Sequence, residues 1–118
     1  MSLFRPAGTN YMPVVDLAAA TSWYVEKFGL RQQVTKFDDG QKGTELTESD
    51  EVFFVLGPGN IPTNDETAML YTSRLEKARK YLTLRGVDIG EIQRDRQGTR
   101  FFEMHDLDGN LIEISEEP

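Results

Sequence analysis

The sequence contains no cysteine, which excludes disulfide bridges, thiol nucleophiles and zinc–thiolate sites. No apolar run approaches the roughly 18 residues of a membrane-spanning helix, so the membrane is not an expected partner. The first residues lack a basic segment followed by an apolar one, so we expect no signal peptide and a cytoplasmic protein. Basic residues are also in deficit, because 13 Lys and Arg face 20 Asp and Glu and the net charge is −7. A surface of that sign repels phosphate backbones, so nucleic acid is not an expected partner.

What the chain does contain is typical of one small globular domain. It has 118 residues, of which 38% are apolar and 28% charged. That balance excludes a disordered chain, and that length can bury one core but not two independent ones. We therefore expect a single domain over residues 1–118.

The chain repeats itself at an offset of 58 residues. Repeats are sought first because they fix the architecture. The matched positions share this one offset and are Leu17 with Leu75, Ala20 with Ala78, Gly40 with Gly98, Glu45 with Glu103, and Asp50 with Asp108. The sequence therefore predicts two similar modules.

Each half predicts one strand, one helix and three further strands. In module one, residues 8–57, Asp16 is expected to cap a helix over 17–28 that Gly29 ends. Its strands are expected at 11–15, 32–37, 43–47 and 52–56. Module two, residues 67–115, is expected to have a helix over 74–85, closed by Gly86, and strands at 68–72, 88–94, 100–105 and 111–115. The segment 58–66 between them is dense in Gly and Pro and is expected to be a linker.

The predicted fold class is α+β. A single βαβββ module would leave sheet edges and one sheet face open, so it cannot close a core alone. Two paired modules are expected to form a curved, partly open mixed sheet with the helices outside and a concavity inside, which suits the binding of a small molecule.

The last strand–turn–strand segment carries a family resemblance. The run Gly98-Thr-Arg100-Phe-Phe-Glu-Met-His-Asp106-Leu-Asp-Gly-Asn110-Leu-Ile-Glu113 resembles the signature of the vicinal oxygen chelate superfamily, which includes glyoxalases, bleomycin-resistance proteins and dioxygenases. Leu107 stands where that signature usually has proline. The resemblance implies the fold described above but not one chemistry, because this superfamily includes both enzymes and antibiotic-sequestering proteins.

The same resemblance implies four positions for a divalent metal. Carried onto this chain they are Thr9, Val55, Thr67 and Glu113, and only Glu113 is a credible ligand, because a catalytic metal generally needs about three His, Asp or Glu donors. We therefore expect no metal and no other cofactor. The alternative is a displaced site that uses Glu103, His105 and Glu113.

Strand alternation predicts which side chains face the concavity. If residues 106–110 form a turn, then Glu103 lies opposite Glu113, and two opposed carboxylates repel each other unless a cation, a shared proton or water relieves them. The predicted ligand-binding residues are Tyr11, Phe53, Met69, Tyr71, Phe101, Glu103, His105 and Glu113. For each of them the alternative is a structural or solvated side chain without a ligand.

Three functions remain open at this stage. The first is a metal-independent protein that sequesters a cationic or planar aromatic small molecule, as the bleomycin-resistance branch of the family would. The second is a metal-dependent lyase or isomerase of the glyoxalase type, in which Glu113 would be the catalytic residue. The third is a module without a small ligand. In each case exposed sheet edges and the resemblance both favour a homodimer.

Overall fold

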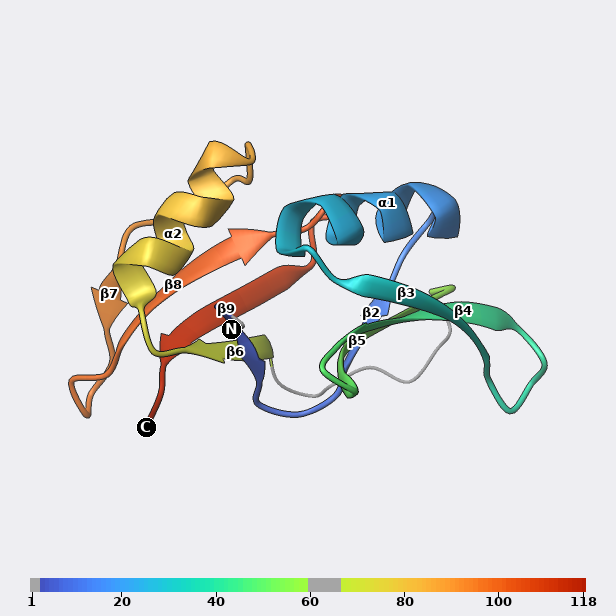
Figure 1. Ribbon diagram of the computed structural model, residues 1–118, viewed down its shortest axis with the longest axis horizontal. Coiled ribbons are helices and arrows are strands. Elements are labelled where there is room, and N and C mark those ends of the chain that lie inside the picture. Colours follow the sequence, from blue (N-terminus) through green and yellow to red (C-terminus); the bar gives the residue numbers. More distant parts are fainter. Residues whose placement is uncertain (1–2, 60–66) are drawn as a thin grey trace.

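A computed structural model describes residues 3–59 and 67–118, and Figure 1 shows its architecture. Residues 60–66, which make up most of the predicted linker, lie outside the described residues. In the part of the chain that is described, no helix is long and apolar enough to cross a membrane. In chain order the elements are β1 (Arg5–Pro6), β2 (Asn10–Pro13), α1 (Leu17–Phe28), β3 (Arg31–Lys36), β4 (Lys42–Glu48), β5 (Glu51–Gly57), β6 (Ala68–Thr72), α2 (Leu75–Leu84), β7 (Gln93–Arg94), β8 (Arg100–His105) and β9 (Leu111–Glu116).

The strands form two mixed sheets that are covered by helices on the same side. One sheet has the order β2-β5-β4-β3, and the other has the order β1-β6-β9-β8-β7. In each sheet the first strand of the module pairs in parallel with the last, and the remaining pairs are antiparallel. Figure 1 shows the sheets side by side, with α1 and α2 above them. The predicted α+β fold class is confirmed, and the predicted open sheet is realised as two unclosed sheets.

The 58-residue offset reappears in the strand register. In the first sheet Tyr11 lies opposite Val55, and Val55 lies opposite Glu45. In the second sheet the equivalent positions are paired in the same way, because Met69 lies opposite Glu113 and Glu113 lies opposite Glu103. The two modules are therefore equivalent at the level of individual residue pairs.

Both modules contribute to one hydrophobic core beneath the helices. The side chains that are buried there come from alternate strand positions, such as Phe54 and Leu56 in module one and Phe102 and Ile114 in module two. Phe4, from the segment before β1, packs between the helices, with ring centroids 5.3 Å from Phe28 and 6.0 Å from Tyr81. Burial of this shared apolar surface holds the helices against the sheets.

The helix ends follow the sequence signals. Asp16 caps α1 by accepting a hydrogen bond from the backbone N–H of Ala19, and Gly29 ends that helix at a φ of 70°. Gly86, with a φ of 79°, follows α2. Trp23 on α1 is half-buried, and its ring forms a T-shaped contact with that of Tyr24.

Two strands are shorter than expected. The first predicted strand ends at Pro13, and Val15 is instead 96% exposed with its backbone N–H bound to the Asp108 carboxylate. Of the predicted strand over 88–94, only Gln93–Arg94 and an isolated bridge at Ile89 remain. Gly90 lies between them, and a glycine inside a strand pattern commonly marks such an interruption.

A buried carboxylate joins the two modules at the turn between β8 and β9. Asp106 is 6% exposed, and one of its oxygens accepts hydrogen bonds from the backbone N–H groups of Asp108 and Asn110. Its other oxygen accepts from the Asn110 side chain at 2.9 Å and from the hydroxyl of Tyr24 on α1 at 2.6 Å. Burial, and then the Asp106 charge, raise the pKa of Tyr24 well above its ordinary value, so the tyrosine remains a donor.

Further polar contacts connect the modules on both sides of this turn. The Asn110 side chain donates to the backbone oxygen of Pro13. The Asn10 side chain donates to the backbone oxygen of Met69 and accepts from its N–H, so one amide bridges the two sheets. Because Asn10 is itself buried, these bonds also satisfy its polar atoms.

Replacing Tyr24 tests whether the buried turn holds the modules together. We expect Tyr24→Phe to lower the free energy of unfolding by about 1–2 kcal/mol, because a buried carboxylate loses one donor while the ring remains packed. The matched control is Tyr81→Phe, because the Tyr81 hydroxyl makes no hydrogen bond among the described residues. Urea denaturation of both variants measures the difference, and equal losses would contradict the assigned role of the Tyr24 hydroxyl.

Candidate functional site

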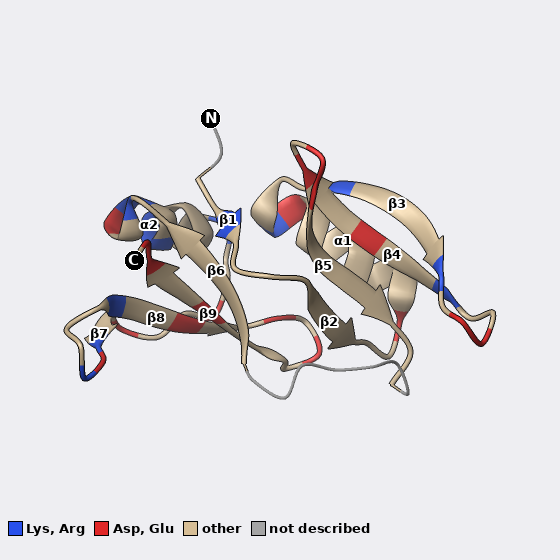
Figure 2. Ribbon diagram, turned by 90° about the horizontal axis from the view of Figure 1, so that it is seen from below, with Lys and Arg blue, Asp and Glu red and all other residues tan. Residues whose placement is uncertain are grey.

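The candidate site lies on the sheet faces that turn away from the helices, which we call the open face. Strand partners share a face, and neighbours along a strand point to opposite faces. Phe102, Met104, Ile112 and Ile114 are fully buried beneath the helices, so the residues that alternate with them lie on the open face. Figure 2 looks onto this face, with α1 behind β4 and β5.

Two carboxylates lie side by side at the centre of the five-stranded sheet. Glu103 on β8 is the cross-strand partner of Glu113 on β9, as the sequence predicts, and Met69 on β6 lies on the other side of Glu113. Burial raises the pKa of Glu113, and the charges of Glu103 and Asp95 raise it further. Glu113 therefore lies in a negative potential on a partly desolvated surface, where a positively charged group would be stabilised.

Aromatic side chains lie next to this pair. Phe101 on β8 and Tyr71 on β6 flank Ser115 of β9 in the next row across the sheet. The guanidinium of Arg5 lies 5.4 Å from the centre of the Tyr71 ring, which shows that this ring already accepts a cation on one side. On the opposite side of the carboxylates, His105 pairs with Leu111 and is exposed.

The structure thus brings six of the eight predicted ligand-binding residues onto one sheet. They are Met69, Tyr71, Phe101, Glu103, His105 and Glu113. Tyr11 lies on the other sheet, 36% exposed, beside the Asn10 amide that joins the sheets.

Phe53 does not lie on the open face as we expected. It is 2% exposed and belongs to the hydrophobic core. The register between β4 and β5 shifts between Leu46 and Thr47, so Phe54 pairs with Leu46, Val52 pairs with Thr47, and Phe53 has no partner. Such a bulge breaks the alternation of side chains, which explains why Phe53 and Phe54 are both buried.

Two further carboxylates belong to this surface and were not among the predicted site residues. Glu45 lies on the open face of the four-stranded sheet, where it pairs with Val55. The repeat carried the signal for it, because Glu45 is equivalent to Glu103. Asp95 acts on Glu113 from the turn between β7 and β8, and no local sequence pattern indicates that contact.

The residues at the four implied metal positions do not fit a divalent ion. Val55 has no donor atom and lies 5% exposed between Tyr11 and Glu45. Thr9 and Thr67 precede β2 and β6 and are exposed, so Glu113 is the one carboxylate of the four. Within residues 3–59 and 67–118 no three or more His, Asp or Glu side chains form a group that could hold a metal ion. Glu103, His105 and Glu113, the alternative site, therefore do not form such a group either.

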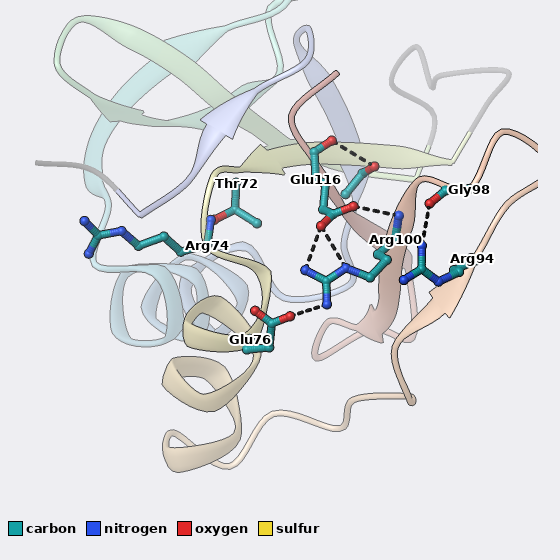
Figure 3. Close-up of polar contacts among 8 residues, drawn as sticks. Thr72, Arg74, Glu76, Arg94, Gly98, Arg100 and Glu116 are labelled. Atoms are coloured by element: carbon teal, nitrogen blue, oxygen red, sulfur yellow. Dashed lines mark hydrogen bonds and ion pairs between the residues drawn. The ribbon is translucent and has the colours of Figure 1, made fainter.

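Arg100, the arginine of the signature, has a structural environment. Its guanidinium binds the Glu116 carboxylate at 2.7 Å and also contacts Glu76 in the first turn of α2 (Figure 3). These hydrogen bonds hold the pKa values of Glu116 and Glu76 below their usual range. Arg100 therefore connects α2 to strands β8 and β9.

A separate cavity of about 270 Å³ lies between the β4–β5 hairpin and the amino-terminal segment. Phe4, Arg5, Glu48, Glu51, Phe53 and Glu117 are among its lining residues. Of the predicted ligand-binding residues it includes Phe53 alone, and it contains neither of the paired carboxylates.

Removing the Glu113 charge tests the electrostatics of the pair. The folded-state pKa of Glu113 lies above the ordinary value of 4.5, so its ionisation costs stability as pH rises through that folded-state pKa. Glu113→Gln should therefore raise Tm at pH 7, and this gain should disappear below about pH 4, where the carboxyl is protonated in both states. Asp38→Asn, at an exposed carboxylate in the turn between β3 and β4, is the control and should not shift Tm. An equal gain at both pH values would contradict this explanation.

Comparisons with solved structures show the same fold in proteins of different function. A member of the glyoxalase/bleomycin resistance protein/dioxygenase superfamily from Sphaerobacter thermophilus DSM 20745 is 22% identical, with a TM-score of 0.74 over 92% of this chain and 94% of that one. TnmS3, an antibiotic-binding protein from Streptomyces sp. CB03234, is 21% identical, with a TM-score of 0.73 over 93% of each chain. A lactoylglutathione lyase from Agrobacterium tumefaciens is 18% identical, with a TM-score of 0.68 over 94% of each.

The sequence itself identifies the family. Among curated proteins none is a significant match to this chain. The family model described as Glyoxalase/Bleomycin resistance protein/Dioxygenase superfamily, however, matches residues 8–114, which include both modules. With the two-module register and the signature turn in place, this chain belongs to the glyoxalase/bleomycin resistance protein/dioxygenase superfamily.

Proposed function

We propose that this protein binds and sequesters a small organic compound without a metal, and that the compound carries a positive charge, a planar aromatic system or both. The observation that carries this proposal is the Glu103–Glu113 pair, set on an open sheet face with the pKa of Glu113 raised. A ligand cation placed between the two carboxylates removes their mutual repulsion and gains two charge-assisted hydrogen bonds.

The rings beside the pair support the aromatic part of this proposal. Tyr71 and Phe101 provide flat apolar surface next to the carboxylates, and Met69 completes the row with a polarizable side chain. Aromatic rings and carboxylates on one surface suit a planar cation, because stacking and Coulomb attraction then act on the same group. The antibiotic-binding relative with the same fold supports the proposal that this chain binds a small molecule.

The proposed ligand site is closed by a second copy of the chain. Small-molecule sites usually bury about 70–90% of the ligand surface, which a single sheet face cannot do. On the open face Tyr11 is 36% exposed and His105 is exposed, so this surface is available to a partner. We therefore propose a homodimer whose open faces enclose the ligand.

A ligand screen tests the proposed binding. Cationic and planar aromatic compounds are screened by thermal shift, and a compound at about 100 times its Kd should add about 2.7 kcal/mol of stability. The shift should disappear in Glu103→Gln/Glu113→Gln and persist in the Asp38→Asn control. Metal analysis of protein purified without chelator accompanies the screen. A stoichiometric divalent ion would favour the lyase or isomerase alternative, and the lack of any shift across the compound set would contradict binding.

Sedimentation measures the proposed homodimer directly. Analytical ultracentrifugation of the free protein should give a species of twice the chain mass of 13.4 kDa. Phe101→Glu, which adds a charge on the open face, should shift this species toward the monomer because like charges would then accumulate beside Glu103. A dimer that is unaffected by this change would place the interface elsewhere.

A further inference from the structure

Helix α2 concentrates positive charge in an otherwise acidic protein. The segment 74–85 contains five of the chain's 13 Lys and Arg, namely Arg74, Lys77, Arg79, Lys80 and Arg85, and one acidic residue, Glu76. Its net charge is +4, and the rest of the chain therefore carries −11, because the whole chain carries −7.

Four of these five cations form no ion pair with a carboxylate in the part of the chain that the structure describes. Arg79 is the exception, because it lies 3.9 Å from Glu91, and it also donates to the backbone oxygen of Gly90. Arg85 stacks 3.7 Å from the centre of the Tyr81 ring. Arg74, Lys77 and Lys80 are exposed, and no described carboxylate lies within ion-pair distance of them. Glu76, the acidic residue of the segment, is already bound to Arg100, and Figure 3 shows the Arg74 side chain extending away from that network.

Lys77 and Lys80 lie together with an exposed leucine. At about 100° per residue, Lys77, Lys80 and Leu84 fall within about 60° of one another, on the side opposite the buried residues Leu75 and Leu82. Leu84 is 75% exposed. We call Arg74, Lys77, Lys80 and Leu84 the basic face, and it lies on the helix side of the molecule, away from the open face (Figure 1).

This arrangement is unfavourable for the helix itself. Like charges three residues apart, as in Arg74–Lys77 and Lys77–Lys80, repel each other along a helix surface. Arg74 and Lys77 also lie at the amino-terminal end, where the helix dipole disfavours cations. Arg74 occupies the N-cap position and makes no side-chain capping bond, although Asp16 caps α1. Local choices that oppose the fold are expected where a residue serves a function.

We propose that the basic face docks an acidic, amphipathic segment of another protein. The positive charge of the basic face favours a negatively charged partner. The exposed Leu84 favours a partner that also has an apolar residue beside its carboxylates. The face from Lys77 to Leu84 is about 10 Å long, which matches about two turns of a helix. A nucleic acid or an anionic membrane is an extended surface and would also meet the −11 charge of the rest of the chain, whereas a short segment contacts the basic face alone.

A binding assay with matched charge reversals tests this docking surface. The probe is a fluorescent glutamate-rich peptide with one leucine, measured by anisotropy at low salt. Arg74→Glu/Lys77→Glu/Lys80→Glu should weaken binding at least about tenfold, because three attractive charges become repulsive. The control Arg31→Glu/Lys36→Glu/Lys42→Glu makes the same change in net charge at exposed sites on β3 and β4 and should retain most of the binding. Leu84→Ser should also weaken binding, which separates docking from charge attraction alone.

The results that would overturn the proposal are equally specific. Equal weakening by the two triple variants would show that the peptide responds to the net charge of the protein and not to the basic face. Oligothymidine and phosphatidylglycerol vesicles are tested in the same way. If either binds more tightly than the peptide and this binding is lost in the α2 triple variant, the partner is not an acidic protein segment. Circular dichroism checks that each variant is folded. If the triple variant is not folded, Lys77→Gln/Lys80→Gln replaces it, because this change reduces the charge repulsion along the helix. Unchanged peptide binding by Lys77→Gln/Lys80→Gln would also overturn the proposal.

Discussion

The buried carboxylate of Asp106 fixes how the two modules lie against each other. It lies in the β8–β9 turn of module two, yet one of its oxygens accepts a hydrogen bond from the Tyr24 hydroxyl on the helix of module one. An ionised carboxylate is tolerated at 6% exposure because four donors surround it. The register of the signature turn, the burial of the shared core and the orientation of β9 all depend on this arrangement. The most recognisable motif of the chain therefore acts here as a structural connection between modules.

Much of the fold could be predicted from the sequence because its signals are local and repeated. Asp16 and Gly29 predicted one helix, and the expected turn at residues 106–110 predicted the pairing of Glu103 with Glu113. Phe53 could not be placed in this way, since a single shift of register between β4 and β5 leaves it without a strand partner. The contacts of Asn10 and Asp95 were equally inaccessible, because each joins segments that no periodic pattern relates.

The candidate site and the implied metal positions show how one fold can keep its geometry while its chemistry changes. Val55 and Glu113 occupy equivalent positions, but only one of them has donor atoms. Glu103 and Glu113 lie opposite each other on neighbouring strands, and neither forms an ion pair with a described residue. Burial, and then the charges of Glu103 and Asp95, raise the pKa of Glu113. The proposal of cation binding depends on this pair.

The residue-by-residue equivalence of the modules has a consequence for recognition. Two identical halves would present the same groups on both sheets, so a bound molecule could lie in either direction. Here the row Tyr11–Val55–Glu45 is neutral at its centre, whereas its counterpart Met69–Glu113–Glu103 is charged there. The two modules are thus arranged pseudosymmetrically but differ in charge at equivalent positions. Under the proposed function, this difference would fix the direction in which an asymmetric ligand binds.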